Sequence, residues 1–476
     1  MVDSPTRSAR RVVVLAVCLG AVVLLCGAGA MGWWLTLEPA EAIAARIPRE
    51  DPLGTGSTRT GGPAEGHLIA GSGKPSQLPG SWPQFRGPDR TGMVSEAAGL
   101  ARAWSDAGPK VLWSLEVGDG YAGPIVEAGR VYLMDYDREA QADALRCLSL
   151  DDGTEMWRFA YPVVIKRNHG MSRTTPAVAD GCVVAIGPKC HVICVDATGG
   201  KLLWSMDLVR DFGTRVPDWY AGQCPLIDNG RVILAPSGRE ALMVAVDLHT
   251  GKEIWRTPNP MRWQMTHASL AVMEFAGRRM AIYCGSGGVA GIDLADGKLL
   301  WKTTEWKIPI ATVPSPVVLD DGRLFLSGGY DAGAMMLRLK AGDNGALEPT
   351  IEYQLRSREF GATQHTPILR DGYLYGIRPP RGELTCLDLD GKVLWASGRG
   401  AIFGLGPLLI AGDLIYALNE NGKLVLAQAT PAAYQPLGEA QVFEGHEAWG
   451  PMALAGTRLL VRDLTTLRCL DVGATP

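Results

Sequence analysis

Residues 175–204 read TPAVADGCVVAIGPKCHVICVDATGGKLLW, and this stretch decides the fold. A short apolar run follows Pro176, and a β-branched run covers residues 182–186. A third run extends from residue 191 to 196, and a last one ends on Trp204. The runs are separated by Asp-Gly at 180–181, Gly-Pro at 187–188 and Thr-Gly-Gly at 198–200, which are typical of tight hairpin turns. The stretch therefore predicts one meander of four short antiparallel strands.

The same pattern recurs with a period of about 40–50 residues, which is typical of four-stranded propeller blades. Most copies start at a residue followed by Pro, pass an Asp-Gly or Asn-Gly turn, and end on Trp. We identify eight starts, near residues 124, 176, 225, 269, 316, 367, 407 and 451.

The eighth copy reaches the C-terminus without its last strand. Residues 111–115 form a strand pattern that precedes the first copy and belongs to none of the eight. An N-terminal strand that completes the last blade would close the ring and remove the open sheet edges. We therefore predict an all-β fold, an eight-bladed propeller of four-stranded antiparallel blades over residues 104–473. The fifth copy lacks its final Trp and carries an insertion at 340–350, and the seventh is short, so a ring of seven blades is the alternative.

The repeat runs from Ser, Thr or Gly before Pro, through Asp-Gly-Arg-Val-Tyr and Leu-x-Cys-Leu-Asp, to Thr-Gly-Lys-x-x-Trp. It resembles the PQQ-like (pyrroloquinoline-quinone-like) propeller repeats, a superfamily that includes quinoprotein alcohol dehydrogenases and the BamB-type propellers of outer-membrane assembly. Residues 81–88, SWPQFRGP, resemble the lead-in segment of secreted proteins with these repeats. The resemblance implies the fold, while one fold hosts both enzymes and scaffolds.

Six tryptophans fall in the last strand of a repeat, and we expect them to pack between blades. They are Trp113, Trp157, Trp204, Trp255, Trp301 and Trp395.

The N-terminal part carries an export signal. Residues 1–11 include three arginines, and residues 12–37 contain no charge, which is long enough for a transmembrane signal-anchor. Basic residues before it place the N-terminus in the cytoplasm and the propeller in the periplasm or another extracytoplasmic space. Cleavage after an Ala28-Gly-Ala30 site and lipidation at Cys26 are the alternatives. Residues 38–80 are predicted as a flexible linker, and residues 81–103 as the lead-in segment.

Charge and cysteine content narrow the function classes. A net charge of −4 gives no electrostatic surface for nucleic acid. Four of the ten cysteines occupy equivalent positions in separate repeats, too far apart to bridge, so we predict no disulfide framework. A Cys182–Cys190 link across one hairpin is the alternative.

For the quinoprotein dehydrogenases, the resemblance implies an adjacent Cys-Cys disulfide, a Trp floor, calcium ligands from Glu, Asn and Asp, and an Asp base. The sequence contains no Cys-Cys dipeptide, and the other motifs have no matching positions in it. We therefore predict no catalytic residue and no cofactor, with PQQ and calcium as the alternative. Histidines 169, 267, 365 and 446 come from blades around the ring, so we predict no metal site from them.

The loops that enter the innermost strands should surround one end of the central channel, and polar and aromatic side chains there indicate a binding surface. The candidate residues are Tyr121, His169, Arg173, Trp219, Tyr220, Gln223, Trp263, His267, Gln364, His365, Phe403, Glu447 and Trp449. The alternative is that these side chains only satisfy partly buried backbone groups.

The sequence thus favours a non-catalytic, membrane-anchored platform that resembles BamB-type propellers and binds a protein or peptide partner in the cell envelope. One alternative is a quinone-dependent oxidoreductase with an atypical site at the channel mouth. Another is a polysaccharide or small-molecule binder that stacks its ligand on Trp219, Trp263 and Trp449.

Overall fold

The computed structural model describes residues 15, 18–22, 24–27, 29, 31, 62–95, 98–105, 107–166, 170–308, 310–342, 345–445 and 447–474. The chain divides into two units, Met1–Leu53 and Gly54–Pro476, and the propeller belongs to the second. The predicted segments 1–11 and most of 12–37 lie outside the described residues. Among the residues that are described, no helix is long and apolar enough to cross a membrane.

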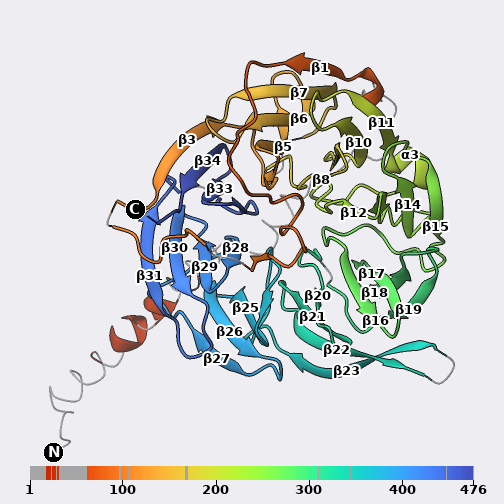
Figure 1. Ribbon diagram of the computed structural model, residues 1–476. Coiled ribbons are helices and arrows are strands. Elements are labelled where there is room, and N and C mark those ends of the chain that lie inside the picture. The colour runs from red at the N-terminus through yellow and green to blue at the C-terminus, as the bar shows by residue number, and fades with distance from the viewer. Residues whose placement is uncertain are drawn as a thin grey trace, which may run out of the picture. The chain divides into compact units, whose positions relative to one another are not determined.

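Eight antiparallel sheets form a closed ring, which confirms the eight-bladed propeller (Figure 1). Each blade runs outward from the channel in chain order. Blade 1 contains β4 (Ile125–Glu127), β5 (Arg130–Asp137), β6 (Ala142–Ser149) and β7 (Glu155–Pro162). Blade 2 contains β8 (Ala177–Ala179), β9 (Cys182–Ile186), β10 (His191–Asp196) and β11 (Leu202–Asp207). Blade 3 contains β12 (Leu226–Asp228), β13 (Arg231–Leu234), β14 (Met243–Asp247) and β15 (Glu253–Thr257). Blade 4 contains β16 (Ala271–Phe275), β17 (Arg278–Gly285), β18 (Gly288–Asp293) and β19 (Leu299–Thr303).

The remaining blades complete the ring. Blade 5 contains β20 (Val317–Val318), β21 (Arg323–Gly328), β22 (Gly333–Ala341) and β23 (Leu347–Leu355). Blade 6 contains β24 (Ile368–Arg370), β25 (Tyr373–Arg378), β26 (Glu383–Asp388) and β27 (Val393–Ala396). Blade 7 contains β28 (Leu408–Ala411), β29 (Leu414–Leu418), β30 (Lys423–Gln428) and β31 (Pro436–Gln441). Blade 8 contains β32 (Ala453–Ala455), β33 (Arg458–Arg462), β34 (Thr466–Asp471) and, as predicted, the N-terminal β3 (Lys110–Glu116).

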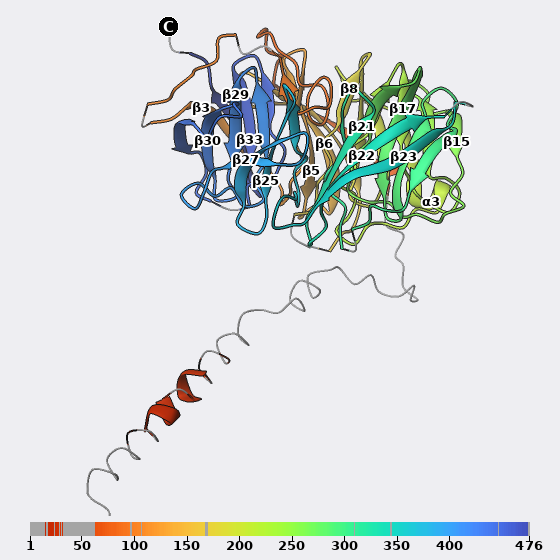
Figure 2. The ribbon, with the colours of Figure 1, turned by 90° about the horizontal axis from the view of Figure 1, so that it is seen from below.

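The segment before the ring is more ordered than the sequence suggests. Within the predicted flexible linker, η1 (Pro63–Glu65) is followed by β1 (His67–Ala70), which adds a fifth strand to the outer edge of blade 1. The lead-in forms β2 (Met93–Val94), parallel to β28. A short helix, α3 (Leu208–Phe212), connects blades 2 and 3. Seen edge-on, the lead-in lies at the upper face of the ring and α3 near the lower face (Figure 2).

The six tryptophans lie between blades as predicted, with 3% to 9% of their surface exposed. Trp204 is representative, because its Nε1–H donates to Leu248 O of the next blade at 2.8 Å. A Cβ on Gly251 would lie 2.7 Å from its ring, which explains the Gly of the Thr-Gly-Lys turn. Trp301 differs, since its Nε1–H contacts Met280 Sδ (3.3 Å) in its own blade.

Two blades without the repeat tryptophan use other aromatic residues. In blade 5, Tyr353 takes the position of the repeat tryptophan, next to the register shift between β22 and β23, and it packs against Gly391. In blade 7 this position is Gly438, and Trp104 of the lead-in packs over it. The Trp104 ring lies 6.1 Å from that of Tyr416, much as a repeat tryptophan lies 6.1 Å from a Tyr in blade 6.

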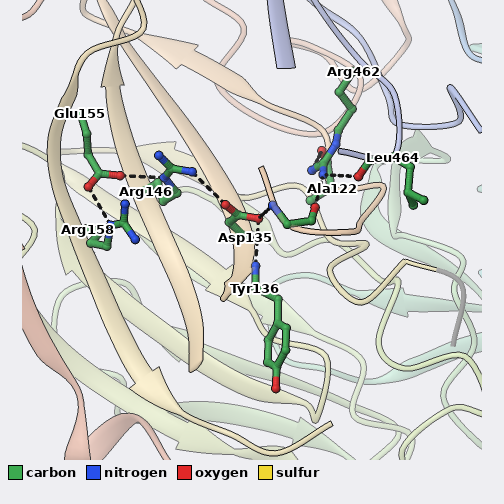
Figure 3. Close-up of polar contacts among 9 residues, drawn as sticks. Ala122, Asp135, Tyr136, Arg146, Glu155, Arg158, Arg462 and Leu464 are labelled. Carbon is green, nitrogen blue, oxygen red and sulfur yellow. Dashed lines mark hydrogen bonds and ion pairs between the residues drawn. The ribbon is translucent and has the colours of Figure 1, made fainter. Parts of the chain in front are cut away.

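The junction of blades 8 and 1 is closed by a buried cation (Figure 3). Arg462 of β33 is fully buried and donates to Ala122 O (3.1 Å), Gly118 O (3.0 Å) and Leu464 O (3.3 Å). On the other side, Asp135 accepts from Gly118 N–H (2.8 Å) and pairs with Arg146 (2.9 Å). The loop from residue 118 to 122 is therefore held from both sides.

No disulfide joins any of the cysteines in the described part of the chain, so the Cys182–Cys190 link does not form.

Candidate functional site

Side chains at the start of the inner strands link neighbouring blades. The N–H of Thr175 donates to Cys224 Sγ (3.2 Å), and that of Cys224 to Ser269 Oγ (2.9 Å). The N–H of Ser269 donates to Ser315 Oγ (3.1 Å), and that of Ser315 to Thr366 Oγ1 (2.9 Å). We call these five residues the inner belt. Because each bond joins one blade to the next, the belt fixes the spacing of the loops that enter blades 2 to 6.

The lead-in crosses the centre of the ring, where we call residues 82–94 the plug (Figure 1). Trp82 exchanges backbone hydrogen bonds with Val126 of blade 1, and Pro83 O accepts from Val178 N–H of blade 2. At its far end the plug pairs with β28 of blade 7. One segment thus links the inner strands of blades 1, 2 and 7.

Two arginines of the plug bind carbonyl groups at the start of inner strands. Arg86 donates Nη1–H to Thr366 O at 2.7 Å. Arg90 donates Nε–H to Leu270 O and Nη1–H to Pro225 O, both at 3.1 Å. The tip of the plug therefore lies next to the inner belt.

At the mouth, loops of different blades bring aromatic and charged side chains together. Tyr121 donates its hydroxyl to Glu447 Oε2 (2.5 Å), and its ring lies 5.1 Å from that of Trp449. The Arg173 guanidinium lies over the same ring at 5.1 Å and its Nε–H donates to Trp219 O. These five residues, with His267, form what we call the mouth cluster.

Backbone pairing between loops positions this cluster. Tyr121 N–H donates to Ser172 O (2.7 Å), next to Arg173. Glu447 adopts a left-handed conformation with φ 49°. Such a conformation is unfavourable for a residue with a long side chain and is held only where the surroundings enforce it. The cluster is therefore preorganised by the fold.

Burial and charge set the protonation states at the mouth. Burial and the nearby Arg173 guanidinium lower the pKa of His267 to about 4, so its imidazole is neutral at pH 7. The ring of Trp219 lies 6.4 Å from that of His267. Burial, followed by the hydrogen bond to Glu447, raises the pKa of Tyr121. The cluster thus combines the Arg173 guanidinium with the half-buried rings of Trp219 and Trp449, while Tyr121 is only 5% exposed and packs against them.

Four other candidates have structural roles. Tyr220 is buried and donates its hydroxyl to Lys166 O (2.6 Å). Gln223 accepts from Ala235 N–H (3.0 Å) of β13. Trp263 is 6% exposed and packs over the glycines of the β17–β18 hairpin, and Phe403 is buried in the core. Tyr220 and Gln223 thus satisfy backbone groups, whereas Trp263 and Phe403 pack in the interior and offer little surface to a ligand.

The last three candidates are His365, Gln364 and His169. His365 accepts from Ile377 N–H at its Nε2 (2.8 Å) and lies near Arg86 of the plug. Gln364 is half-buried beside it in the chain. His169 lies outside the described residues.

Sequence analysis missed four residues of this region. Glu420 accepts from Trp449 Nε1–H at 3.4 Å, and Tyr330 of blade 5 interacts electrostatically with Arg173. Arg86 and Arg90 were available in the recognised lead-in. Their role depends on contacts across some 135 to 280 positions of sequence, which no local pattern encodes.

We tested whether the described residues fit calcium-bound PQQ. Within the ranges that the structure describes, no group of three His, Cys, Asp or Glu side chains is placed to hold a metal ion. The mouth cluster contains Glu447, with Glu420 next to Trp449 and with Asp119 and Asp218 in the same loops, but these carboxylates do not form a metal-binding group. This donor set does not match the one implied for the dehydrogenases, and the residues present therefore do not fit the cofactor.

The fold and its repeats define a propeller protein of the PQQ-like superfamily. A family model described as "Outer membrane protein assembly factor BamB" matches residues 142–397, more than half of the chain, and the chain belongs to this family.

Individual relatives are distant. The chain is 24% identical over 274 residues to outer membrane protein assembly factor BamB of Yersinia pestis, covering 47% of this chain and 66%, just under two thirds, of that protein. It is 27% identical over 248 residues to the dehydrogenase subunit of the quinone alcohol dehydrogenase of Gluconobacter oxydans, covering 48% and 30% of the two chains. A solved quinohemoprotein alcohol dehydrogenase of Pseudomonas putida HK5 aligns with a TM-score of 0.47 and 14% identity, over 84% of this chain and 81% of that one.

Proposed function

We propose that this chain is a non-catalytic propeller that binds a protein or peptide partner in the cell envelope through its mouth cluster. The observation that carries the proposal is the convergence of Tyr121, Arg173, Trp219 and Trp449 from loops of different blades. Trp, Tyr and Arg are the residue types that dominate the binding energy of protein interfaces. Here they are held by backbone pairing between loops, which reduces the entropy lost on binding.

The family supports a role in the assembly of outer membrane proteins, as the name of the Yersinia pestis relative states for that protein. On this proposal residues 12–37 anchor the chain in the membrane, with the N-terminus in the cytoplasm and the propeller in the periplasm. The partner is then a component of the assembly machinery or its client.

Site-specific photo-crosslinking in the native envelope tests the proposal. A photoreactive residue at Trp219 should crosslink to one defined envelope protein. The same residue at Glu274, which is exposed on the β16–β17 hairpin at the opposite end of the inner strand, is the matched control.

The partner identified in this way is then purified for binding measurements. We expect Arg173→Gln and Trp219→Ala to weaken binding at least tenfold, because hot-spot side chains contribute about 2 kcal/mol or more each. Glu274→Ala should bind like the wild type. Equal crosslinking from Glu274, or unchanged affinity in both mouth variants, would refute the mouth as the binding surface.

A further inference from the structure

A groove of about 770 Å³ lies where blades 4 and 5 meet, at the same end of the blades as the mouth. It is lined by residues 305–307 after β19, by residues within 331–335 at the β21–β22 turn, and by residues within 354–359 at the end of β23. The segments that follow β19 and β23 lead directly into the inner strands β20 and β24. The volume is in the range typical of ligand-binding clefts.

The groove has an apolar floor and charged walls. Trp306 and Met335 line it and are only 5% and 1% exposed, and Trp306 is not one of the repeat tryptophans. Glu305 and Lys307, on either side of Trp306 in the chain, are exposed and form no ion pair with another described residue. The groove therefore offers apolar contact together with one free charge of each sign. This combination suits a peptide better than it suits an apolar or a uniformly charged ligand.

The opposite wall is held together by its own polar contacts. Arg356 donates its backbone N–H to Glu359 Oε2 (2.9 Å) and its Nη2–H to Glu359 Oε1 (2.8 Å). Ser357 donates its hydroxyl to Asp331 Oδ1 (3.1 Å). The last bond joins the segment after β23 to the β21–β22 turn, so two of the three lining segments are linked to each other.

The β21–β22 turn connects the groove with the mouth cluster. Ala332 N–H donates to Gly329 O (3.0 Å), and the two residues between them, Tyr330 and Asp331, have φ angles of 54° and 63°. Such left-handed positions favour Gly or Asn, and a bulky residue is retained there where the place of its side chain matters. Asp331 lines the groove, whereas Tyr330 is 37% exposed and interacts electrostatically with Arg173 of the mouth cluster.

The loop between β19 and β20 provides a second connection. It begins at the groove with Trp306, and Thr312 O further along accepts from the N–H of His267 in the mouth cluster (3.0 Å). Six residues of chain span at most about 20 Å, so the two sites are near each other. Between them lies Ile310, which is 50% exposed. The route from the mouth to the groove thus carries exposed apolar side chains from both connections.

We propose, on the basis of the proposed function, that the groove is a second part of the binding surface and that the partner lies across the mouth cluster and the groove as an extended peptide segment. A distance of about 20 Å corresponds to about six residues of extended chain. In this arrangement one apolar side chain of the segment contacts Trp306 and Met335. A charged side chain next to it pairs with Glu305 or Lys307.

Photo-crosslinking of the full chain in the native envelope tests the proposal. A photoreactive residue is placed at Gln354, which lines the groove, or at Trp219 in the mouth cluster. We expect both positions to crosslink to the same protein, at sites within about ten residues of each other in its sequence. Glu348 is exposed on the same strand as Gln354 but outside the groove, and as the matched control it should give no such crosslink.

The possible outcomes separate this inference from the proposed function. A crosslink from Trp219 alone would overturn the role of the groove and leave the mouth as the binding surface. Crosslinked sites that lie far apart in the sequence of the partner would show a folded surface and would overturn the extended segment. Absence of a crosslink from either position would refute the proposed function as well.

Tyr330→Gly tests the connection between the two sites. Gly adopts the left-handed conformation readily, so we expect Tm to stay the same or rise. Binding of a synthetic peptide that spans the crosslinked stretch should weaken about fivefold or more, because an aromatic contact is lost. Asp371→Gly makes the same kind of replacement at φ 49° in the β24–β25 hairpin, at the opposite end of the blade, and should leave the Kd unchanged.

Wild-type affinity of Tyr330→Gly for this peptide would show that the segment does not pass over the turn and would contradict the proposed route. A peptide that fails to bind the wild-type chain, while the intact partner binds it, would likewise overturn the extended segment.

Discussion

Replacement of Arg462 by Met tests how the ring is closed and how the mouth is positioned. The guanidinium is fully buried and donates to four backbone carbonyls, that of Asp463 and those of Ala122, Gly118 and Leu464 at the junction of blades 8 and 1. Met fills a similar volume but leaves Ala122 O, Gly118 O and Leu464 O without these donors. Each unsatisfied buried acceptor costs about 1–3 kcal/mol, and the relief of burying a charge offsets part of the loss. We therefore expect the free energy of unfolding to fall by about 3–5 kcal/mol.

Urea unfolding followed by tryptophan fluorescence measures this change, with Arg102→Met as the control. The exposed Arg102–Asp413 pair should contribute little to stability, because solvent screens a surface ion pair. Hydrogen exchange should increase first in β3 and β34, because Arg462 holds the loop that follows β3. If the stability of Arg462→Met equals that of the wild type, the closure is held by the β3–β34 pairing alone and the reasoning about the buried cation is wrong.

Three further outcomes follow from buried side chains. Trp204→Ala should lower the free energy of unfolding by about 3–5 kcal/mol, and Trp204→Phe by only about 0.5–1.5 kcal/mol, since it loses mainly the bond to Leu248 O; equal losses in urea would contradict this. Trp104→Ala should cost about 2–4 kcal/mol although the residue precedes the first repeat, and a loss below about 1 kcal/mol would show that it does not replace a blade tryptophan. Burial raises the pKa of Asp143 to about 7. The folded state then holds a proton that the unfolded state has lost between about pH 4 and 7, so stability should fall as pH rises through this window. Asp143→Asn should remove that fall, and parallel pH profiles of the two proteins would refute the assignment.

The sequence predicts the parts of this fold that repeat. In most blades the last strand carries a Trp that packs against a turn glycine of the next blade, as Trp204 packs against Gly251. Both residues recur in the sequence at a fixed spacing and can be recognised locally. The closing strand was predictable because residues 111–115 had no repeat of their own. Trp104 was not, since it acts in a blade whose own chain position is Gly438, more than 300 residues away.

The candidate site was predicted only in part, for a related reason. A loop position tells which residues surround the channel but not which way each side chain turns. Tyr121 packs against Trp449 of another blade, whereas Trp263 packs against the glycines of its own blade. The plug arginines were missed because their partners are main-chain carbonyls, which every sequence contains.

The inner belt spans only part of the ring, and several links from outside the repeat lie in the rest of it. The belt requires Ser, Thr or Cys at the start of the inner strand, and it runs from Thr175 to Thr366. The equivalent positions in blades 7, 8 and 1 are Gly406, Gly450 and Gly123, which have no side chain to accept the bond. Blades 7, 8 and 1 therefore need other links to their neighbours. It is here that the chain supplies β2 beside blade 7, Trp104 over Gly438, β3 in blade 8 and Arg462 at the junction with blade 1. The lead-in segment thus compensates for the missing part of the belt, and the loop with Tyr121 depends on it as much as on the repeats.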